Sequence, residues 1–482
     1  MQSEYEYCGQ CRLLLVIADS DPQSRSLRIE IPDRVRDDIE YNRKMNIVLI
    51  LVGKIFSWFS RATGMGSGST WPGHIALETN KNFIKEVLAK NKHLKIILIA
   101  GTNGKTTTGK LIQAILEKNG GKVFQNEAGA NLLNGIASSL LLHSLLNGKI
   151  MFDYAVFEVD ENSLPLILNE LTPDYLILLN IFRDQLDRYG ETDIIANKWA
   201  KAITALPSST SLILNADDPQ IVFIGNSTKS KAYYFGLSNK TLNQTAHQHA
   251  VDSTYCPRCR NKLTYTTVYF SHLGDWSCSN CGLKRPGLAR PGLYRDVPKD
   301  SSSHYPLDGV YNQYNTHAAV LFAKLNNINN STIQQSLQSF SPAFGRQEKL
   351  TIEGKNVQIF LSKNPTSFNE SLRTIIEKGG KNLLIVLNDQ IPDGRDVSWI
   401  WDVDTEKLIK KDINIVISGD RAFDMGLRLK YSSSSKFQIE DNLREAIMVA
   451  FNQTQKSETL YVLPTYSAML EVRKILTGKK IL

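Results

Sequence analysis

A glycine-rich loop between a buried strand and an amphipathic helix is the feature that most constrains the fold of this chain. The run KIILIA (95–100) is apolar after its first residue, and GTNGKTTT (101–108) follows it directly. Apolar residues then recur at helical spacing over 111–116. A strand, a tight loop and a helix in this order are typical of a parallel sheet that is covered by helices on both faces.

The loop has the chemistry of a phosphate-binding site. Glycines let backbone N–H groups approach phosphates, and the start of a helix adds the positive end of its dipole. Lys105 would reach the β- and γ-phosphates, and Thr106 would place its hydroxyl on Mg²⁺. The motif departs from GxxxxGK[ST] because Ile99 occupies the first glycine position, and a glycine-rich turn without a ligand is the alternative. The predicted nucleotide-binding residues of the loop are Gly101, Thr102, Asn103, Gly104, Lys105, Thr106 and Thr107.

Glu158 is the predicted second ligand of the magnesium ion. It lies near the end of another predicted strand, YAVFEV (154–159). Mg²⁺ prefers hard oxygen ligands, and a carboxylate beside a phosphate loop supplies one. An acidic residue at a strand end is usually only solvated, so it is the loop that favours the metal-binding interpretation.

The predicted strands form two groups. The first group continues with apolar runs at 175–181 and 211–216, and polar residues follow each run. Ligands of such sheets bind beyond the carboxyl ends of the strands. The second group follows GRQEKL (345–350), and its strands are predicted at 357–362, 382–388, 413–419 and 459–464.

These patterns predict three regions. Residues 45–343 are expected to form a central ATP-binding domain, with an insertion at about 250–290. Residues 344–482 are expected to form a smaller, Rossmann-like α/β domain. Residues 1–44 are polar and unpatterned, and are predicted to be a disordered or spurious extension.

The composition fits a globular chain. Hydrophobic residues make up 42% of it and charged residues 22%. No apolar run reaches the ~20 residues that span a bilayer. Without a secretory signal at Met1, the chain is expected to work in the cytoplasm. The net charge of +8 is spread along the sequence, so it fits an anionic small substrate, a membrane surface or a nucleic acid equally well.

The cysteines occur as CxxC pairs. Cys256 and Cys259 are followed, after eighteen residues, by Cys278 and Cys281. This spacing predicts a four-thiolate zinc ribbon, and a closed site of this kind is structural. Four unligated thiols are the alternative. The remaining pair, Cys8/Cys11, lies in the unpatterned first segment and is not expected to bind metal.

Several motifs resemble those of the ATP-dependent Mur ligase superfamily. In chain order they are GTNGKTTT, FEVDE, LLNIFRDQLDRYGE, ANKWAK, LNADDP, YNQYNTHAA and FGRQE. The resemblance implies an enzyme that phosphorylates a substrate carboxylate with ATP and then lets an amine displace the phosphate. It also implies that Glu158 ligates magnesium, that Asn312 and Asn315 lie near the nucleotide, and that Arg346 lies at the hinge to the last domain.

One position departs from the superfamily pattern. Lys198 matches the lysine that many members carbamylate to bind a second magnesium. The stretch that often supplies a magnesium-binding histidine reads DQLD here, with Gln185 in place of the histidine. Because an amide is a weaker ligand than an imidazole, the second magnesium site and the carbamylation of Lys198 stay open.

The ribbon narrows the resemblance to the MurT family, the synthetase subunits of lipid II isoglutaminyl synthase. The matching stretches also include 61–77, 363–370 and 393–404. The resemblance implies that the α-carboxylate of D-glutamate in lipid II becomes an amide, at the inner face of the plasma membrane. It implies that the ammonia comes from a partner glutaminase of the GatD type.

The resemblance further implies that the C-terminal domain contacts the glutaminase and supplies an aspartate to its Cys-His-Asp triad. Such an aspartate would orient the histidine and stabilise its protonated form. Asp396 is the favoured candidate and Asp393 the next, because both follow the predicted strand 382–388. A turn or helix-capping role is equally compatible with either residue.

Two other functions fit parts of the sequence. A stand-alone Mur-type or folylpolyglutamate-type amino-acid ligase would share the loop, but the ribbon and Gln185 argue against it. A zinc-ribbon ATPase that binds nucleic acid would fit the net charge, but only Lys284, Arg285 and Arg290 lie just after the ribbon. No nucleic-acid partner is therefore expected.

Overall fold

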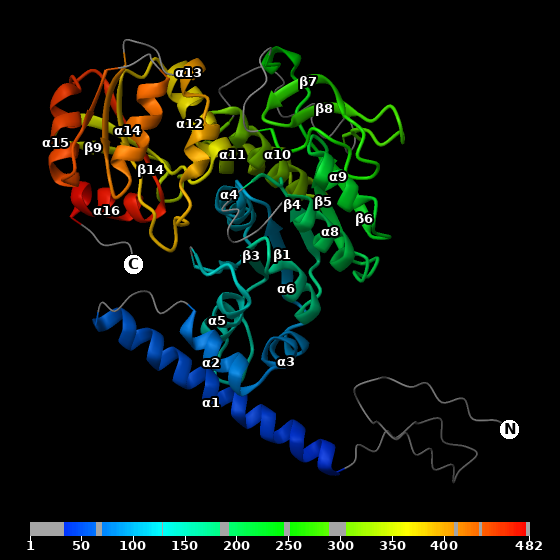
Figure 1. Cartoon of the computed structure of the whole chain (residues 1–482). Coiled ribbons are helices and arrows are strands. Elements are labelled where there is room, and N and C mark those ends of the chain that lie inside the picture. Colours follow the sequence, from blue (N-terminus) through cyan, green and yellow to red (C-terminus); the bar gives the residue numbers. More distant parts are fainter. Residues whose placement is uncertain are drawn as a thin grey trace, which may run out of the picture.

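Two six-stranded sheets and a two-stranded hairpin form the framework of the molecule (Figure 1). The structure is a computed structural model of the whole chain. The residues it describes are 33–63, 70–127, 129–183, 192–244, 251–288, 305–408, 413–432 and 436–478. The predicted α/β class, with a parallel central sheet and a second sheet in the C-terminal part, is confirmed.

The first sheet is parallel throughout and has the strand order β2-β3-β1-β4-β5-β6. Its strands are β1 (Lys95–Ala100), β2 (Val123–Gln125), β3 (Tyr154–Val159), β4 (Tyr175–Leu178), β5 (Ser211–Asn215) and β6 (Lys231–Phe235). In β1, Ile96 and Leu98 belong to the core on one face, whereas Ile97 and Ile99 belong to the core on the other. Burial on both faces explains why the sequence of this strand is continuously apolar.

Helices cover both faces of this sheet. The face that receives Ile97 and Ile99 packs against α4 (Lys105–Lys118), α10 (Val310–Leu325) and α11 (Asn330–Gln338). The helices on the opposite face are α2 (Trp71–Thr79), α3 (Phe83–Lys90), α5 (Leu133–His143), α6 (Leu164–Glu170), α8 (Thr192–Ile203) and α9 (Pro219–Gly225).

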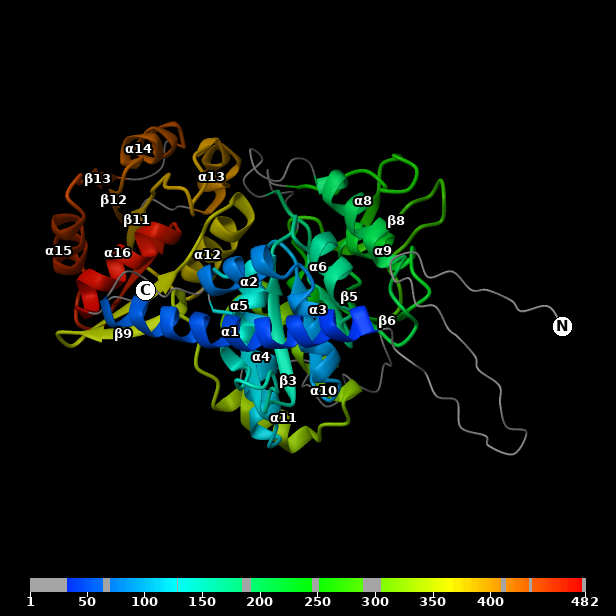
Figure 2. The ribbon, with the colours of Figure 1, turned by 90° about the horizontal axis from the view of Figure 1, so that it is seen from below.

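A long N-terminal helix, α1 (Asp33–Thr63), packs beneath α2 and α5 (Figures 1 and 2). It begins within the stretch 1–44 that was predicted to be an extension, so 33–44 are helical, whereas 1–32 lie outside the described residues. Within the described part of the chain, no helix has both the length and the apolar character needed to cross a bilayer.

The second sheet has the order β13-β12-β11-β14-β10-β9 and is parallel except for the β9–β10 hairpin. Its strands are β9 (Arg346–Ile352), β10 (Lys355–Phe360), β11 (Asn382–Val386), β12 (Asn414–Ser418), β13 (Phe437–Ile439) and β14 (Thr459–Pro464). One face packs against α12 (Pro365–Glu377), α14 (Ala422–Tyr431) and the 3-10 helix η3 (Ser398–Asp402). The short helix α13 (Thr405–Leu408) follows η3 and contacts α12. The other face packs against α15 (Leu443–Gln453) and α16 (Tyr466–Thr477).

The hairpin β7 (Thr264–Phe270) and β8 (Leu273–Ser277) belongs to the cysteine-containing segment, which follows the 3-10 helix η1 (Lys240–Leu242). A buried carboxylate attaches this segment to the first sheet. Asp217, just after β5, accepts hydrogen bonds from Arg285 Nε (2.6 Å) and from the Tyr314 hydroxyl of α10 (2.6 Å). Trp276 of β8 also donates to the carbonyl of Ala216 (3.2 Å).

His317 of α10 should make stability depend on pH. Its ring nitrogens contact the Tyr305 hydroxyl (2.9 Å) and the Gly236 carbonyl (2.9 Å), and burial lowers its pKa to about 4. The unfolded chain binds a proton near the ordinary pKa of ~6.5. The stabilisation is therefore complete above pH ~6.5, and up to about 3 kcal/mol is lost as the pH falls towards 4.

We expect His317→Gln to reduce this pH dependence. Urea unfolding at pH 7 and pH 5 should show a smaller difference in the free energy of unfolding for this variant than for the wild type. His74→Gln, at an exposed histidine of α2, is the control. Equal pH dependence in wild type and His317→Gln would contradict the prediction.

Candidate functional site

The predicted phosphate loop lies at the carboxyl edge of the first sheet, between β1 and α4. Two positions of the loop require glycine. The φ angles of Gly101 (145°) and Gly104 (94°) fall in a region that other residues rarely adopt. A Cβ atom on Gly104 would also lie 2.1 Å from Asn315 Oδ1. The loop and α10 therefore approach each other as closely as glycine allows.

Lys105, the first residue of α4, is held inside the site. Its ammonium donates to the carbonyl of Gly101 (2.5 Å) and forms an ion pair with Glu161 Oε1 (3.2 Å). The side chain of Glu161 is only 3% exposed, and its carbonyl accepts a hydrogen bond from Trp199 of α8 (2.8 Å). Glu161 is a site residue that the sequence analysis missed, although it ends the motif FEVDE.

Thr106 and Glu158 are brought together as the sequence predicts for a pair of magnesium ligands. The Thr106 hydroxyl donates to Glu158 Oε2 (2.8 Å). Burial raises the pKa of Glu158, whereas the Thr106 hydrogen bond and the positive charges of Arg346, Lys105 and Lys110 oppose that rise. A hydroxyl and a carboxylate side by side are hard oxygen ligands of the kind that Mg²⁺ takes. These two residues could therefore hold the ion.

Asn126 fixes the backbone at Glu158. It accepts from the Glu158 amide (2.9 Å) and donates to the Glu158 carbonyl (2.9 Å). The backbone that carries the Glu158 side chain is therefore held in place.

A cleft of about 670 Å³, its open mouth included, lies beside the loop between the two sheets. The first-sheet part, β7 and α10 contribute Asn103, Gly104, Thr107, Asn180, Phe270, Tyr311, Asn312, Tyr314 and Asn315 to its lining. The C-terminal part contributes Gly345, Arg346, Gln347, Phe360, Leu361, Thr366, Ser367, Glu370 and Ser371. Asn312, Asn315 and Arg346 therefore line one cleft with the loop.

Arg346 is half-buried at the start of β9. Burial lowers its pKa, and the negative charge of Glu158 opposes this effect. Asn315 donates to Asn312 Oδ1 (3.1 Å), and Asn312 donates to the Asp308 carbonyl (2.8 Å), so both amides have fixed orientations.

Asparagine side chains hold the loop from two sides. The sequence did not predict this arrangement. The Asn103 amide donates to Asn180 Oδ1 (2.9 Å), and Asn180 Nδ2 donates back to the Asn103 carbonyl (3.0 Å). Asn364, the N-cap of α12, donates to Asn103 Oδ1 (3.2 Å) across the cleft. The available sequence signal for Asn180 was its position directly after the apolar run of β4.

The second magnesium site, which the sequence left open, is not assembled from described residues. The side chain of Lys198 is exposed on α8. The stretch with Gln185, from Asp184 to Asp187, lies outside the described residues.

The structure gives the two candidate triad aspartates different environments. Asp393 is buried, accepts from the Ser467 amide (2.8 Å) and contacts the Ser467 hydroxyl, so it supports the start of α16. Burial raises its pKa. Asp396 is exposed and accepts from the Ser398 amide (2.8 Å), and hydrogen bonds from Ser398 lower its pKa. Of the two, Asp396 is the accessible carboxylate.

Nearby tryptophans have packing roles. Trp399 packs near Phe368, with ring centroids 5.9 Å apart, and Trp401 lies beneath the guanidinium of Arg428 (5.6 Å).

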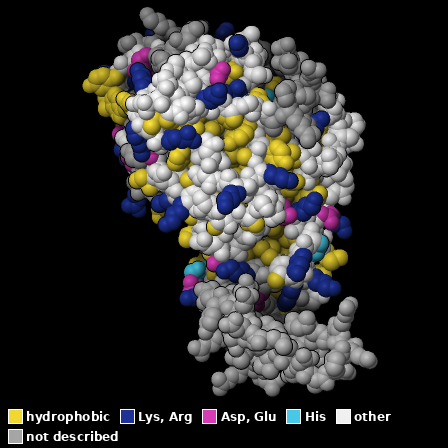
Figure 3. Space-filling view, turned by 90° about the vertical axis from the view of Figure 1, so that its right-hand side faces the viewer, with side chains coloured by type: hydrophobic (Ala, Val, Ile, Leu, Met, Phe, Trp, Pro, Cys, Tyr) yellow, Lys and Arg dark blue, Asp and Glu magenta, His cyan; other side chains and the backbone are white. Residues whose placement is uncertain are grey.

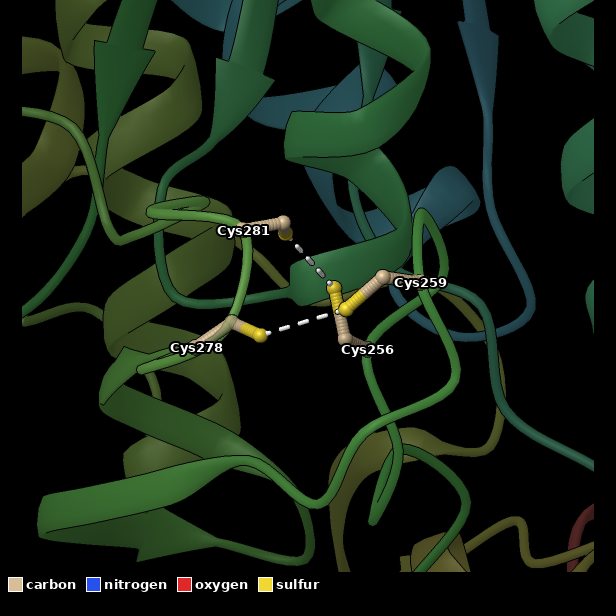
Figure 4. A group of neighbouring side chains, drawn as sticks. All are labelled: Cys256, Cys259, Cys278 and Cys281. Carbon is tan, nitrogen blue, oxygen red and sulfur yellow. Dashed lines mark hydrogen bonds between the residues drawn. The ribbon is translucent and has the colours of Figure 1, made fainter.

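The four cysteines of the ribbon converge on one point (Figure 4). Their sulfurs all lie within 4.8 Å of one another, with Cys256–Cys281 at 3.6 Å and Cys259–Cys278 at 3.4 Å. A tetrahedral site with Zn–S bonds of ~2.3 Å needs sulfurs about 3.8 Å apart. The geometry therefore fits zinc.

Two thiols of the cluster have different electrostatic environments. Hydrogen bonding, chiefly with Asn280, lowers the pKa of Cys259 to about 6, whereas burial raises the pKa of Cys256.

Comparisons with known proteins agree with this architecture. The Mur ligase middle domain family matches residues 99–280, and the MurT ligase C-terminal family matches residues 361–469. The chain is 34% identical over 431 residues to the MurT subunit of the glutamine-hydrolyzing lipid II isoglutaminyl synthase of Streptococcus pneumoniae, covering 86% of this chain and 94% of the relative. It is also 34% identical to the Staphylococcus aureus MurT subunit, covering 79% and 86%.

Solved structures show the Mur ligase fold. A pseudomurein peptide ligase type C from Methanothermus fervidus aligns with a TM-score of 0.59 at 20% identity, covering 82% of this chain and 81% of that one. The MurF ligase of Thermotoga maritima, solved with ADP, aligns with a TM-score of 0.57 at 12% identity, covering 82% and 83%.

We expect Cys256→Ser to lose the ribbon's zinc and to lower the thermal stability of the chain. A structural zinc site is coupled to folding, because the ligands converge only in the folded state. Metal analysis should find about one zinc per wild-type chain and much less in the variant. Cys11→Ser, in the isolated CxxC pair, should keep the wild-type zinc content. A full zinc complement in Cys256→Ser would rule out the ribbon site.

Proposed function

This chain belongs to the MurT family, the ligase subunits of lipid II isoglutaminyl synthase, and we propose that it activates the α-carboxylate of D-glutamate in lipid II for amidation. The observation that carries the proposal is the loop at the cleft, where Lys105, Thr106 and Glu158 meet next to a C-terminal part that matches MurT.

The proposed reaction has two steps. In the first, a carboxylate oxygen attacks the γ-phosphorus of ATP, which gives an acyl phosphate and ADP. In the second, ammonia attacks the carbonyl carbon, and phosphate leaves with the C–O bond electrons to give D-isoglutamine. The residues contribute by positioning and by charge, which are the main devices of phosphoryl transfer. Bound Mg²⁺ would neutralise the charge that develops on the phosphates.

Each residue at the loop has a proposed part. The backbone amides of the loop and the start of α4 bind phosphate oxygens. Lys105, which is neutralised by Glu161 without nucleotide, turns its ammonium to the β- and γ-phosphates. Thr106 and Glu158 would hold magnesium. Asn312, Asn315 and Arg346 contact the nucleotide from the α10 and β9 sides of the cleft.

The partner is proposed to be a GatD-type glutaminase subunit that supplies the ammonia. Ammonia is protonated in bulk water, so it needs a protected route between the two active sites. The exposed, ionised carboxylate of Asp396 is suited to complete the partner's Cys-His-Asp triad, because it can face a second protein and stabilise an imidazolium. Asp393 is already engaged by Ser467.

Two alternatives are weaker. A stand-alone amino-acid ligase would use an amino acid in place of ammonium, and the match of residues 361–469 to the MurT C-terminal family argues against it. A nucleic-acid-binding ATPase is expected to gather its cations in one stripe or patch. On the face drawn in Figure 3, Lys and Arg are scattered among apolar and neutral side chains.

Lys105→Ala should lower ATP-dependent amidation of lipid II by at least about a hundredfold, because it removes the cation aimed at the transferred phosphate. The assay is mass analysis of lipid II after incubation with ATP and ammonium chloride. Lys118→Ala, at the exposed far end of the same helix, should keep wild-type activity. Near-normal turnover of Lys105→Ala would remove the phosphate-loop assignment.

Asp396→Asn should keep the complex assembled but lower glutamine hydrolysis by up to about 10⁴-fold, because an amide does not stabilise an imidazolium as a carboxylate does. Amidation driven by added ammonium should survive, since the loop and Glu158 are untouched. Asp393→Asn should lower the melting temperature through Ser467 and leave hydrolysis intact in the folded protein. Loss of glutamine hydrolysis in Asp393→Asn but not in Asp396→Asn would assign the triad role to Asp393. Normal hydrolysis in both variants would show that this loop supplies no triad residue.

A further inference from the structure

The outer face of α1 is apolar over the segment 47–59. In the segment 47–59, eight large apolar side chains are at least 37% exposed. They are Ile47, Val48, Leu51, Val52, Ile55, Phe56, Trp58 and Phe59. At 1.5 Å per residue the segment extends about 18 Å. Solvent-exposed apolar side chains are normal when scattered, but a continuous row of them indicates an interaction surface.

The rotation of α1 about its own axis is fixed by the inner face, where Leu49 and Ile50 are buried in the core and polar and small residues make close contacts. Asn46 donates to Glu86 Oε2 (2.6 Å) and accepts from Asn80 (3.0 Å). A Cβ atom on Gly53 would lie 2.6 Å from a methyl group of Leu141 on α5. The helix therefore cannot turn its exposed apolar side chains inward without breaking these contacts.

Nothing in the described part of the chain covers this face. Figure 2 shows α1 in front of α2, α3 and α5, on the outside of the molecule. Trp71 (59% exposed) and Ile75 (36% exposed) add apolar surface on α2, which packs against α1.

The charge of the segment identifies the kind of partner. Between Glu40 and Glu78 the sequence has no Asp or Glu, but it has Arg43, Lys44, Lys54 and Arg61. Basic residues around exposed Trp and Phe side chains are typical of helices that lie in the interface of an anionic bilayer. Such a helix lies in the plane of the bilayer.

We propose that the segment 47–59 of α1 lies flat on an anionic lipid bilayer, with the side chains of Val48, Ile55 and Trp58 in the headgroup region and with Lys54 near lipid phosphates. Membrane binding by α1 rests on the proposed function for its biological purpose. A lipid-linked substrate is confined to the membrane, so the enzyme has to reach it there. Vesicle binding itself needs neither ATP nor the glutaminase, so it can be tested separately.

The test is flotation of the full chain with vesicles of phosphatidylglycerol and phosphatidylcholine. The wild type should float with vesicles rich in phosphatidylglycerol, and less at high salt or with pure phosphatidylcholine. Ile55→Glu/Trp58→Glu should bind at least about tenfold more weakly, because it puts negative charge into the interface. Ile55→Gln/Trp58→Gln gives a second measurement without added charge. Phe423→Glu/Met448→Glu, at exposed apolar positions of α14 and α15, should bind as the wild type does.

Three results would overturn the proposal. The wild type could fail to float, the Ile55/Trp58 variants could float as well as the wild type, or sedimentation could show that the face joins two copies of the chain instead. Amidation of a water-soluble lipid II analogue separates this proposal from the proposed function. The folded Ile55/Trp58 variants should amidate the analogue normally and lipid II in vesicles poorly. If the wild type amidates neither, the proposed function fails whatever the flotation result.

Discussion

Burial of β1 on both faces is the constraint on which the rest of the site depends. Its side chains alternate between two cores, so the strand can occupy only the middle of a covered parallel sheet. Its carboxyl end then delivers the loop at Gly101 to the same edge where β3 delivers Glu158 and β4 is followed by Asn180. The backbone therefore brings together three segments that are far apart in the sequence.

The C-terminal part completes this edge. Asn364 at the start of α12 bonds to Asn103 of the loop, and Arg346 lies close enough to Glu158 for each charge to shift the pKa of the other. The cleft is thus lined by two units with separate cores. Asn364 and Arg346 therefore connect the C-terminal part directly to the residues at this edge.

The cysteine-containing ribbon is connected to the site through a buried carboxylate. Its Arg285 and the Tyr314 hydroxyl of α10 share the carboxylate of Asp217, and burial raises the pKa of that carboxylate. Tyr314 also lines the cleft, one residue before Asn315. The cysteine-containing insertion therefore helps to hold the helix that carries the asparagines.

The sequence by itself determined the features that depend on local periodicity and spacing: the loop at 101–108, the long apolar strands and the four cysteines. It did not reveal the short strands β2 and β13, because three residues carry too little periodicity. Only the tertiary structure decided which polar residues meet at the site. Asn180 and Glu161 became part of it because parallel strands end at one edge, and Asp393 was separated from Asp396 because the packing of α16 buried one and left the other exposed. The outward apolar face of α1 was likewise decided by packing, since Gly53 and Asn46 fix the rotation of that helix.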